Sequence, residues 1–128
     1  MTMNGILIEQ LLLDELRRRK LTFAAAESCT GGLIAKRITD LSGASAVFRG
    51  GVVSYTNDVK RDVLGVPQTL LDAYGAVSAP VAQAMAEGAR HITGADLAVS
   101  VTGVAGPDRD DRGNEVGTPV TDTADRRR

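Results

Sequence analysis

The sequence predicts an α/β fold, with helices on both faces of a sheet of short, buried strands. Three apolar runs have the length and composition of buried strands, and segments with helical periodicity separate them. The chain has 128 residues, of which 43% are apolar, and this size suits one domain with its own core. These observations favour a three-layer α/β/α sandwich.

A helix, a strand and a second helix are expected first. The spacing in residues 4–20 predicts a helix with one apolar stripe, formed by Ile8, Leu11, Leu12 and Leu16. The basic residues at its end suit the negative end of the helix dipole. The apolar run at residues 21–26 predicts a buried strand. Helical periodicity resumes at Leu33 and ends before Gly43.

A second strand, at residues 47–55, is followed by two short helices. Gly50 and Gly51 mark a bulge or a close backbone approach within the strand. Asn57 is expected to cap the first short helix, and Pro67 to open the second.

Ser78 is expected to cap a longer helix, which a third buried strand follows at residues 96–101. From Asp108 onward the chain is polar and charged and shows no periodicity. We therefore expect the α/β domain to span residues 1–118 and a polar, disordered tail to occupy residues 119–128.

Composition excludes several classes of function. The balance of 15 basic and 16 acidic residues gives no electrostatic basis for binding nucleic acid or an anionic membrane, and 3% aromatic residues provide no stacking platform. One histidine and one cysteine leave only carboxylates as further metal ligands, which argues against a metal site, and the single cysteine fits a reducing cytosol. Acidic residues interrupt the apolar run from Ile6, and basic residues follow it, which is not the pattern of a signal peptide. We expect a cytoplasmic protein without metal or cofactor.

The turn after the first strand, residues 27–32, combines polar and small residues. A strand–turn–helix junction can present Ser28 at the sheet edge, beside backbone N–H groups that favour a phosphate or an oxyanion. Gly31 and Gly32 have no side chains to block that approach. The alternative is that Ser28 or Thr30 only caps the helix.

The turn after the second strand carries Tyr55, Asn57 and Lys60. Lys60 would lie in the first turn of a short helix, where the helix dipole and partial desolvation push a lysine toward its neutral form. A neutral lysine can act as the general base for a serine hydroxyl. The alternative is an ordinary surface lysine.

The turn after the third strand, residues 102–107, is rich in small residues, which suits a loop whose backbone wraps a ligand. It lacks the GxGxxG spacing of a dinucleotide-binding turn. Cys29, next to Ser28 at a helix start, could have a lowered pKa, although a structural thiol is the more common situation.

These motifs occur together and in order, and the set resembles a known family. The segments are AESCTGG at 26–32, FRGGVVSYTN at 48–57, lysine at 60, GAVS at 75–78 and TGVAGP at 102–107. They resemble the C-terminal domain of the competence/damage-inducible protein CinA, the nicotinamide-nucleotide amidohydrolase family. The resemblance implies a mostly parallel mixed sheet and hydrolysis of nicotinamide mononucleotide to nicotinic acid mononucleotide and ammonia, a step of pyridine nucleotide recycling.

The resemblance and the turn chemistry lead to one site hypothesis. Ser28 attacks the carboxamide carbonyl or orients a water, Lys60 accepts and returns the proton, and Tyr55 orients or relays between them. Substrate-binding residues are expected in the same three turns: Thr30, Gly31, Gly32, Asn57, Thr102, Gly103, Ala105 and Gly106.

The end of the chain departs from the family pattern. Relatives follow residues 116–118 with another strand and further elements, whereas this chain has Pro119, which disfavours a central strand, and a charged stretch. We therefore expect C-terminal elements to be missing. A catalytically impaired domain that binds a nucleotide or a protein partner is the alternative function, and a homo-oligomer could cover the exposed sheet edge.

Overall fold

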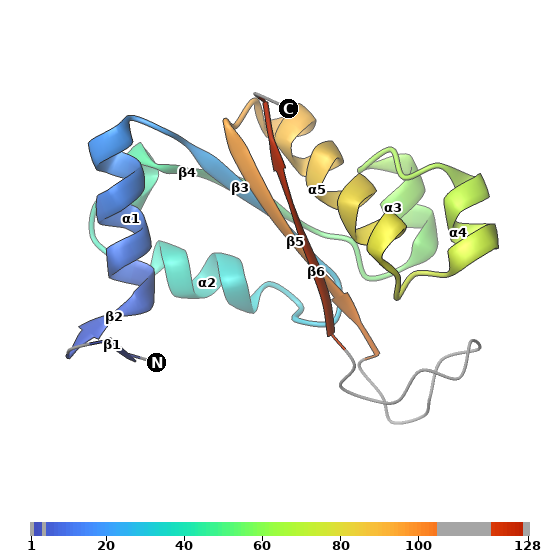
Figure 1. Ribbon diagram of the computed structural model, residues 1–128, viewed down its shortest axis with the longest axis horizontal. Coiled ribbons are helices and arrows are strands. Elements are labelled where there is room, and N and C mark those ends of the chain that lie inside the picture. Colours follow the sequence, from blue (N-terminus) through green and yellow to red (C-terminus); the bar gives the residue numbers. More distant parts are fainter. Residues whose placement is uncertain (1, 4, 105–118, 127–128) are drawn as a thin grey trace.

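The computed structural model describes residues 2–3, 5–104 and 119–126, in which helices and strands alternate as expected (Figure 1). The strands are β1 (Thr2–Met3), β2 (Ile6–Leu7), β3 (Phe23–Glu27), β4 (Phe48–Val53), β5 (Leu97–Gly103) and β6 (Pro119–Asp125). The helices are α1 (Ile8–Arg19), α2 (Leu33–Thr39), α3 (Asn57–Asp62), α4 (Gln68–Tyr74) and α5 (Ala79–Thr93), with a short 3₁₀ turn at Ala44–Ala46.

The main sheet has four strands in the order β4-β3-β5-β6. β3 pairs in parallel with β4 and with β5, and β6 pairs antiparallel with β5. Figure 1 shows α1 and α2 on one side of this sheet and α3, α4 and α5 on the other. The predicted α/β class, with three layers and a mostly parallel mixed sheet, is confirmed.

Each face of the sheet carries its own apolar cluster. One cluster lies between the sheet and the helices α1 and α2, and consists of Leu13, Leu16, Phe23, Ile38, Ala44 and Val47. The other lies under α5 and consists of Ala26, Leu64, Val66, Leu71, Val81, Met85, Ala89 and Ala98. Phe23 and Ala26 contribute to opposite clusters because successive strand residues point to opposite faces. The central strand β3 is therefore buried on both sides.

The two glycines of β4 behave as the sequence predicts. The parallel register shifts by one residue where Phe23 pairs with Phe48 and Ala24 pairs with Gly50, so Arg49 is the extra residue of a bulge. At Gly51, a Cβ atom would lie 3.3 Å from the carbonyl oxygen of Ala25. The predicted bulge and close backbone approach are both present.

The N-terminal helix is shorter than predicted. Residues 4–20 do not form one helix, because β1 and β2 form a small antiparallel hairpin before α1 begins at Ile8. The apolar stripe is also displaced: Leu13 is fully buried, whereas Leu12 is 41% exposed. Rotating the helix by one residue changes which leucines face the core, and the pattern of consecutive leucines did not distinguish the two.

The expectation of a disordered tail is wrong for Pro119–Asp125, which form β6 and pair along the whole length of β5. Pro119 is the first residue of an edge strand, where a residue without an N–H group is tolerated. The argument from Pro119 therefore disfavours a central strand but does not exclude an edge strand. Ala124 is buried and packs into the sheet, and Arg126 pairs with Asp96 at 2.7 Å.

None of the helices among the described residues combines the length and apolarity that crossing a membrane requires.

Helix α5 approaches the segment after α3 at van der Waals distance. A Cβ atom at Gly88 would lie 2.0 Å from the carbonyl oxygen of Leu64. Val66, two residues later, donates its backbone N–H to the carbonyl of Lys60 at 3.0 Å. The packing of α5 thus constrains the segment that leaves α3.

We expect Gly88→Ala to destabilise the fold by about 2 kcal/mol or more, because the methyl group would displace the Leu64 backbone. The higher helix propensity of alanine, about 1 kcal/mol, offsets only part of this loss. Denaturant unfolding would measure the change, with the neighbouring exposed Glu87→Ala as control, expected within about 0.5 kcal/mol of the unaltered chain. A Gly88→Ala variant as stable as that control would contradict the close approach.

Candidate active site

The carboxyl ends of the three parallel strands β4, β3 and β5 lie side by side. Ser28 follows β3, and its backbone N–H donates to the carbonyl of Val101 in β5 at 3.0 Å. Ser54 follows β4, and its N–H donates to the carbonyl of Glu27 at 2.7 Å. Along the chain, β3 is followed by β4 on one side of it and later by β5 on the other side. In open α/β sheets, ligands bind beyond the carboxyl ends of the strands where the strand order reverses in this way. The structure therefore brings the three predicted turns together.

Ser28 and Lys60 are in direct contact at this edge. Lys60 Nζ lies 2.9 Å from Ser28 Oγ. The two side chains are 1% and 6% exposed for Lys60 and Ser28, respectively. Lys60 is thus not the surface lysine of the alternative interpretation, and its amine faces a hydroxyl that is itself protected from solvent.

The surroundings of the Lys60 amine favour its neutral form. Nζ donates to the carbonyl oxygen of Ser54 at 2.7 Å and lies 3.4 Å from that of Tyr55. No carboxylate in the described part of the chain pairs with it. Burial lowers the pKa of Lys60 to about 8, and the electrostatic interaction with Cys29 acts in the opposite direction. Two carbonyls and one hydroxyl are therefore the hydrogen-bond partners of the amine, and burial is what favours its neutral form.

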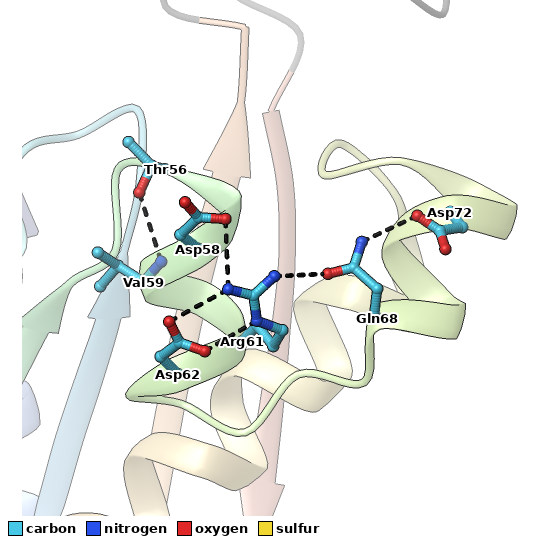
Figure 2. A network of polar contacts seen from close by, with 7 residues as sticks. All are labelled: Thr56, Asp58, Val59, Arg61, Asp62, Gln68 and Asp72. Carbon is cyan, nitrogen blue, oxygen red and sulfur yellow. Dashed lines mark hydrogen bonds and ion pairs between the residues drawn. The ribbon is translucent and has the colours of Figure 1, made fainter.

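A cap and a polar network hold the helix that carries Lys60. The cap of α3 is Thr56, whose hydroxyl accepts from the Val59 N–H at 3.4 Å, so the prediction that Asn57 is the cap is wrong by one residue. Figure 2 shows Arg61 between Asp58 and Asp62 of α3 and Gln68 of α4. Arg61 thereby joins two short helices on the solvent side, while its neighbour Lys60 points inward. Short helices need such tertiary contacts, because few residues stabilise them internally.

The backbone amides of the Ser28 turn are mostly occupied. The carboxylate of Glu27 accepts from the amides of Gly32, Ile34 and Ala35 and from the Thr30 hydroxyl. The Gly31 amide donates to the carbonyl of Ser28. The expectation that amides from Thr30 to Gly32 receive an anion is therefore wrong for Gly31 and Gly32. The amides of Cys29 and Thr30 have no partner among the residues that the structure describes.

The remaining predicted site residues differ in their exposure and in their hydrogen-bond partners. The Tyr55 side chain is 61% exposed, and within the described ranges its hydroxyl has no hydrogen-bond partner, so it does not bridge Ser28 and Lys60. Thr102 is fully buried and donates to the carbonyl of Ala76 at 3.0 Å, which makes its side chain structural. Asn57 is exposed on α3, and Gly103 ends β5. Ala105 and Gly106 lie outside the described residues.

Sequence reasoning did not foresee the roles of Glu27 and Ser54. Glu27 ends an otherwise apolar strand, and a carboxylate that the strand buries needs donors, which is a signal that could have been used. The part played by the Ser54 carbonyl has no counterpart in the side-chain sequence. Across residues 2–3, 5–104 and 119–126, no three His, Cys, Asp or Glu side chains are grouped so that they could hold a metal ion.

The lowered pKa of Lys60 predicts a pH dependence of stability. Between pH 8 and 10.5, the unfolded lysine binds a proton that the folded lysine does not, so the free energy of unfolding rises with pH. This rise is at most about 1.4 kcal/mol per pH unit and is absent below pH 8, where both states are protonated. Denaturant unfolding of the unaltered chain and of Lys60→Met, compared from pH 7 to 10.5, would measure it. Parallel pH curves for the two proteins would contradict the lowered pKa.

Comparison with known proteins gives a consistent family. The model of the CinA C-terminal domain matches residues 7–127. The CinA-like protein of Geobacter sulfurreducens is 59% identical over 110 residues, which cover 86% of this chain and 27% of that protein. The CinA-like protein of Geotalea daltonii is 54% identical over 115 residues, 90% of this chain and 28% of that protein. The chain thus spans about a quarter of the length of these relatives.

Solved structures agree with the sequence relatives. The competence/damage inducible protein CihA of Agrobacterium tumefaciens superposes with a TM-score of 0.88 at 43% identity, covering 93% of this chain and 72% of that one. A competence-damaged protein (CinA) superfamily member of Escherichia coli gives 0.90 at 32% identity, with coverages of 94% and 70%. The family match, the relatives and the shared fold lead to one conclusion: the chain belongs to the CinA C-terminal domain family.

Proposed function

We propose that this domain is an amidohydrolase that converts nicotinamide mononucleotide to nicotinic acid mononucleotide and ammonia. The observation that carries the proposal is the buried 2.9 Å contact between Lys60 Nζ and Ser28 Oγ. A serine hydroxyl is a weak nucleophile until a base takes its proton, and a lysine with a pKa of about 8 is partly neutral near pH 7. The substrate follows from the family resemblance of the motifs at Ser28, Tyr55 and Lys60.

In the first half of the proposed reaction, Lys60 accepts the Ser28 proton while Oγ attacks the carboxamide carbon. The carbonyl oxygen becomes an oxyanion in the tetrahedral intermediate. Lys60, now an ammonium, gives its proton to the departing nitrogen, so the C–N bond breaks and ammonia leaves. The product of this half is a nicotinoyl ester on Ser28.

In the second half, a water molecule takes the place of the released ammonia and hydrolyses the ester. Lys60 takes one proton from the water as its oxygen attacks the ester carbonyl, and returns that proton to Ser28 Oγ as the ester bond breaks. Nicotinic acid mononucleotide leaves with the oxygen of water. The same lysine acts as base and acid in both halves, which a pKa near the working pH favours.

Two backbone amides are the donors for the oxyanion in this proposal. The amide of Cys29, the residue after the nucleophile, and that of Thr30 are the free donors of the turn in the described structure. The residue after a nucleophilic serine supplies such a donor in other hydrolases. The exposed ring of Tyr55 takes a different role from the relay first expected: it contacts the cationic pyridinium ring of the substrate, as aromatic faces do with cations.

Ammonia release from nicotinamide mononucleotide tests the proposal. We expect Ser28→Ala and Lys60→Met each to lower kcat/KM by about 10³-fold or more, because either change removes the activated nucleophile. In the unaltered chain, kcat/KM is expected to rise with pH and to level off above an apparent pKa near 8, since only neutral Lys60 is a base. Asp58→Asn, a change at an exposed position of the same helix that has no role in the proposed site, is the comparison for nonspecific effects on α3.

Two results would count against the enzyme. Full deamidase activity in Ser28→Ala would exclude Ser28 as the nucleophile. Stabilisation of the unaltered chain by nicotinamide mononucleotide without any release of ammonia would favour a binding domain of the same fold.

Substitutions at Tyr55 distinguish a ring contact from a hydroxyl relay. We expect Tyr55→Phe to keep kcat/KM within about threefold, because the direct contact between Ser28 and Lys60 needs no relay. Tyr55→Ala is expected to raise KM by about fivefold with a smaller change in kcat, as loss of a contact worth about 1 kcal/mol implies. Equal losses of kcat in the two variants would restore the relay.

A further inference from the structure

Glu27 is a buried carboxylate that forms no ion pair within the described structure, directly beside the proposed nucleophile. The side chain is 1% exposed and ends the central strand β3. A buried charge without a cation needs several hydrogen-bond donors, because desolvation otherwise excludes it from the interior. The question is what those donors are and what they hold in place.

Four donors surround this carboxylate, and all come from the segment that follows Ser28. One oxygen accepts from the Thr30 hydroxyl at 2.7 Å, the Ile34 amide at 2.9 Å and the Gly32 amide at 3.2 Å. The other oxygen accepts from the Ala35 amide at 3.0 Å. Hydrogen bonds to an ionised acceptor are stronger than neutral ones, so the set fastens the turn and the start of α2 to the end of β3.

Glu27 and Ser28 point to opposite faces of the sheet. Glu27 reaches toward α2, whereas Ser28 meets Lys60 of α3 on the face that α5 covers. This arrangement follows from the alternation of side chains along a strand. The turn that carries the nucleophile is therefore anchored from behind by a group that does not itself touch Ser28 Oγ or Lys60 Nζ.

The main chain of Glu27 is joined to the other half of the pair. Its carbonyl oxygen accepts from the Ser54 amide at 2.7 Å and from the Ser54 hydroxyl at 3.3 Å. The carbonyl of Ser54 in turn accepts from Lys60 Nζ. Backbone links of this kind survive a change of the Glu27 side chain, so such a change tests the anchoring of the Ser28 turn alone.

We propose that Glu27 is a positioning residue for the Ser28 nucleophile. Its carboxylate occupies the amides at the start of α2, keeps substrate anions away from them and leaves the Cys29 and Thr30 amides oriented to receive the oxyanion. The inference rests on the proposed function only in taking Ser28 as the nucleophile and these amides as its oxyanion donors. It adds that reactivity of Ser28 depends on a side chain from the opposite face of the sheet.

The test measures the reactivity of Ser28 without relying on the nucleotide substrate. Phenylmethanesulfonyl fluoride reacts when Oγ forms a bond to sulfur and fluoride leaves, while Lys60 takes the serine proton; intact-mass spectrometry follows the product. We expect Glu27→Gln to slow this labelling by about 10- to 100-fold and to lower kcat for the amide by a similar factor. KM is expected to stay within about threefold, and the apparent pKa of the pH profile to stay near 8.

Asp96→Asn is the matched control. Asp96 is a second buried carboxylate that accepts a backbone amide, that of Thr22 at 2.9 Å, but it lies before β5, at the opposite end of the strands. Its loss should lower thermal stability while Ser28 labelling stays within about twofold. Thr30→Val, which removes one of the four donors, is expected to slow labelling by about threefold and serves if Glu27→Gln does not fold.

The outcomes separate this inference from the proposed function. Slowed labelling in Glu27→Gln supports the positioning role even if the unaltered chain releases no ammonia from nicotinamide mononucleotide, a result that would refute only the proposed substrate. The inference is overturned if Ser28 in a folded Glu27→Gln variant is labelled as fast as in the unaltered chain. If Glu27→Gln does not fold, the same result in Thr30→Val overturns it. Equal slowing in Asp96→Asn overturns it too, as does the absence of Ser28 labelling in the unaltered chain.

Discussion

The burial of Lys60 without a carboxylate partner in the described structure is the constraint on which the arrangement of the site depends. An amine in this position is tolerated because two backbone carbonyls and one hydroxyl satisfy it, and because its pKa is lowered so that the charge is readily lost. The carbonyls come from the end of β4, the hydroxyl from the end of β3, and the lysine from α3. Bringing these three together requires parallel pairing of β3 with β4 and a short connection into α3. The contact between Ser28 and Lys60 thus depends on the order of the strands in the sheet.

Most of the fold could be predicted from periodicity and from turn residues. The strands β3, β4 and β5, the helices α2 to α5 and the bulge at Gly50 all correspond to local patterns in the sequence. β6 could not be predicted in this way, because this stretch of threonine, aspartate and small residues has no apolar periodicity. Its stability comes from pairing with β5 and from the ion pair of Arg126 with Asp96, and neither is local in sequence. The hairpin of β1 and β2 was missed because its apolar residues also fit a helical period.

The side chains of the candidate site could be predicted from the sequence, whereas the backbone groups that contact them could not. The residue types in the turns after two strands predict roles for Ser28 and Lys60, and the structure places their side chains in contact. The carbonyls of Ser54 and Tyr55 are invisible in a side-chain pattern, so the tyrosine was assigned a role through its hydroxyl although its carbonyl is what lies near the amine. The sequence predicts an open anion site at Gly31 and Gly32, but the Gly31 amide donates to the Ser28 carbonyl and the Gly32 amide donates to an internal carboxylate. That carboxylate belongs to Glu27, and its place at the end of an otherwise apolar strand is the one sequence signal for its role.

The close approach of α5 to Leu64 has a consequence for how substitutions in this helix would be selected. Gly88 packs against the Leu64 carbonyl, and Val66, two residues later, donates its backbone N–H to the Lys60 carbonyl. A side chain at position 88 would therefore act on Lys60 through the main chain of residues 64–66, although neither Ser28 nor Lys60 belongs to α5. Under the proposed function, selection for turnover and selection for thermal stability would rank variants of α5 differently, because small shifts of Lys60 away from Ser28 would impair proton transfer before the fold is lost. Gly88 would then help to position Lys60, although the two residues lie far apart in sequence.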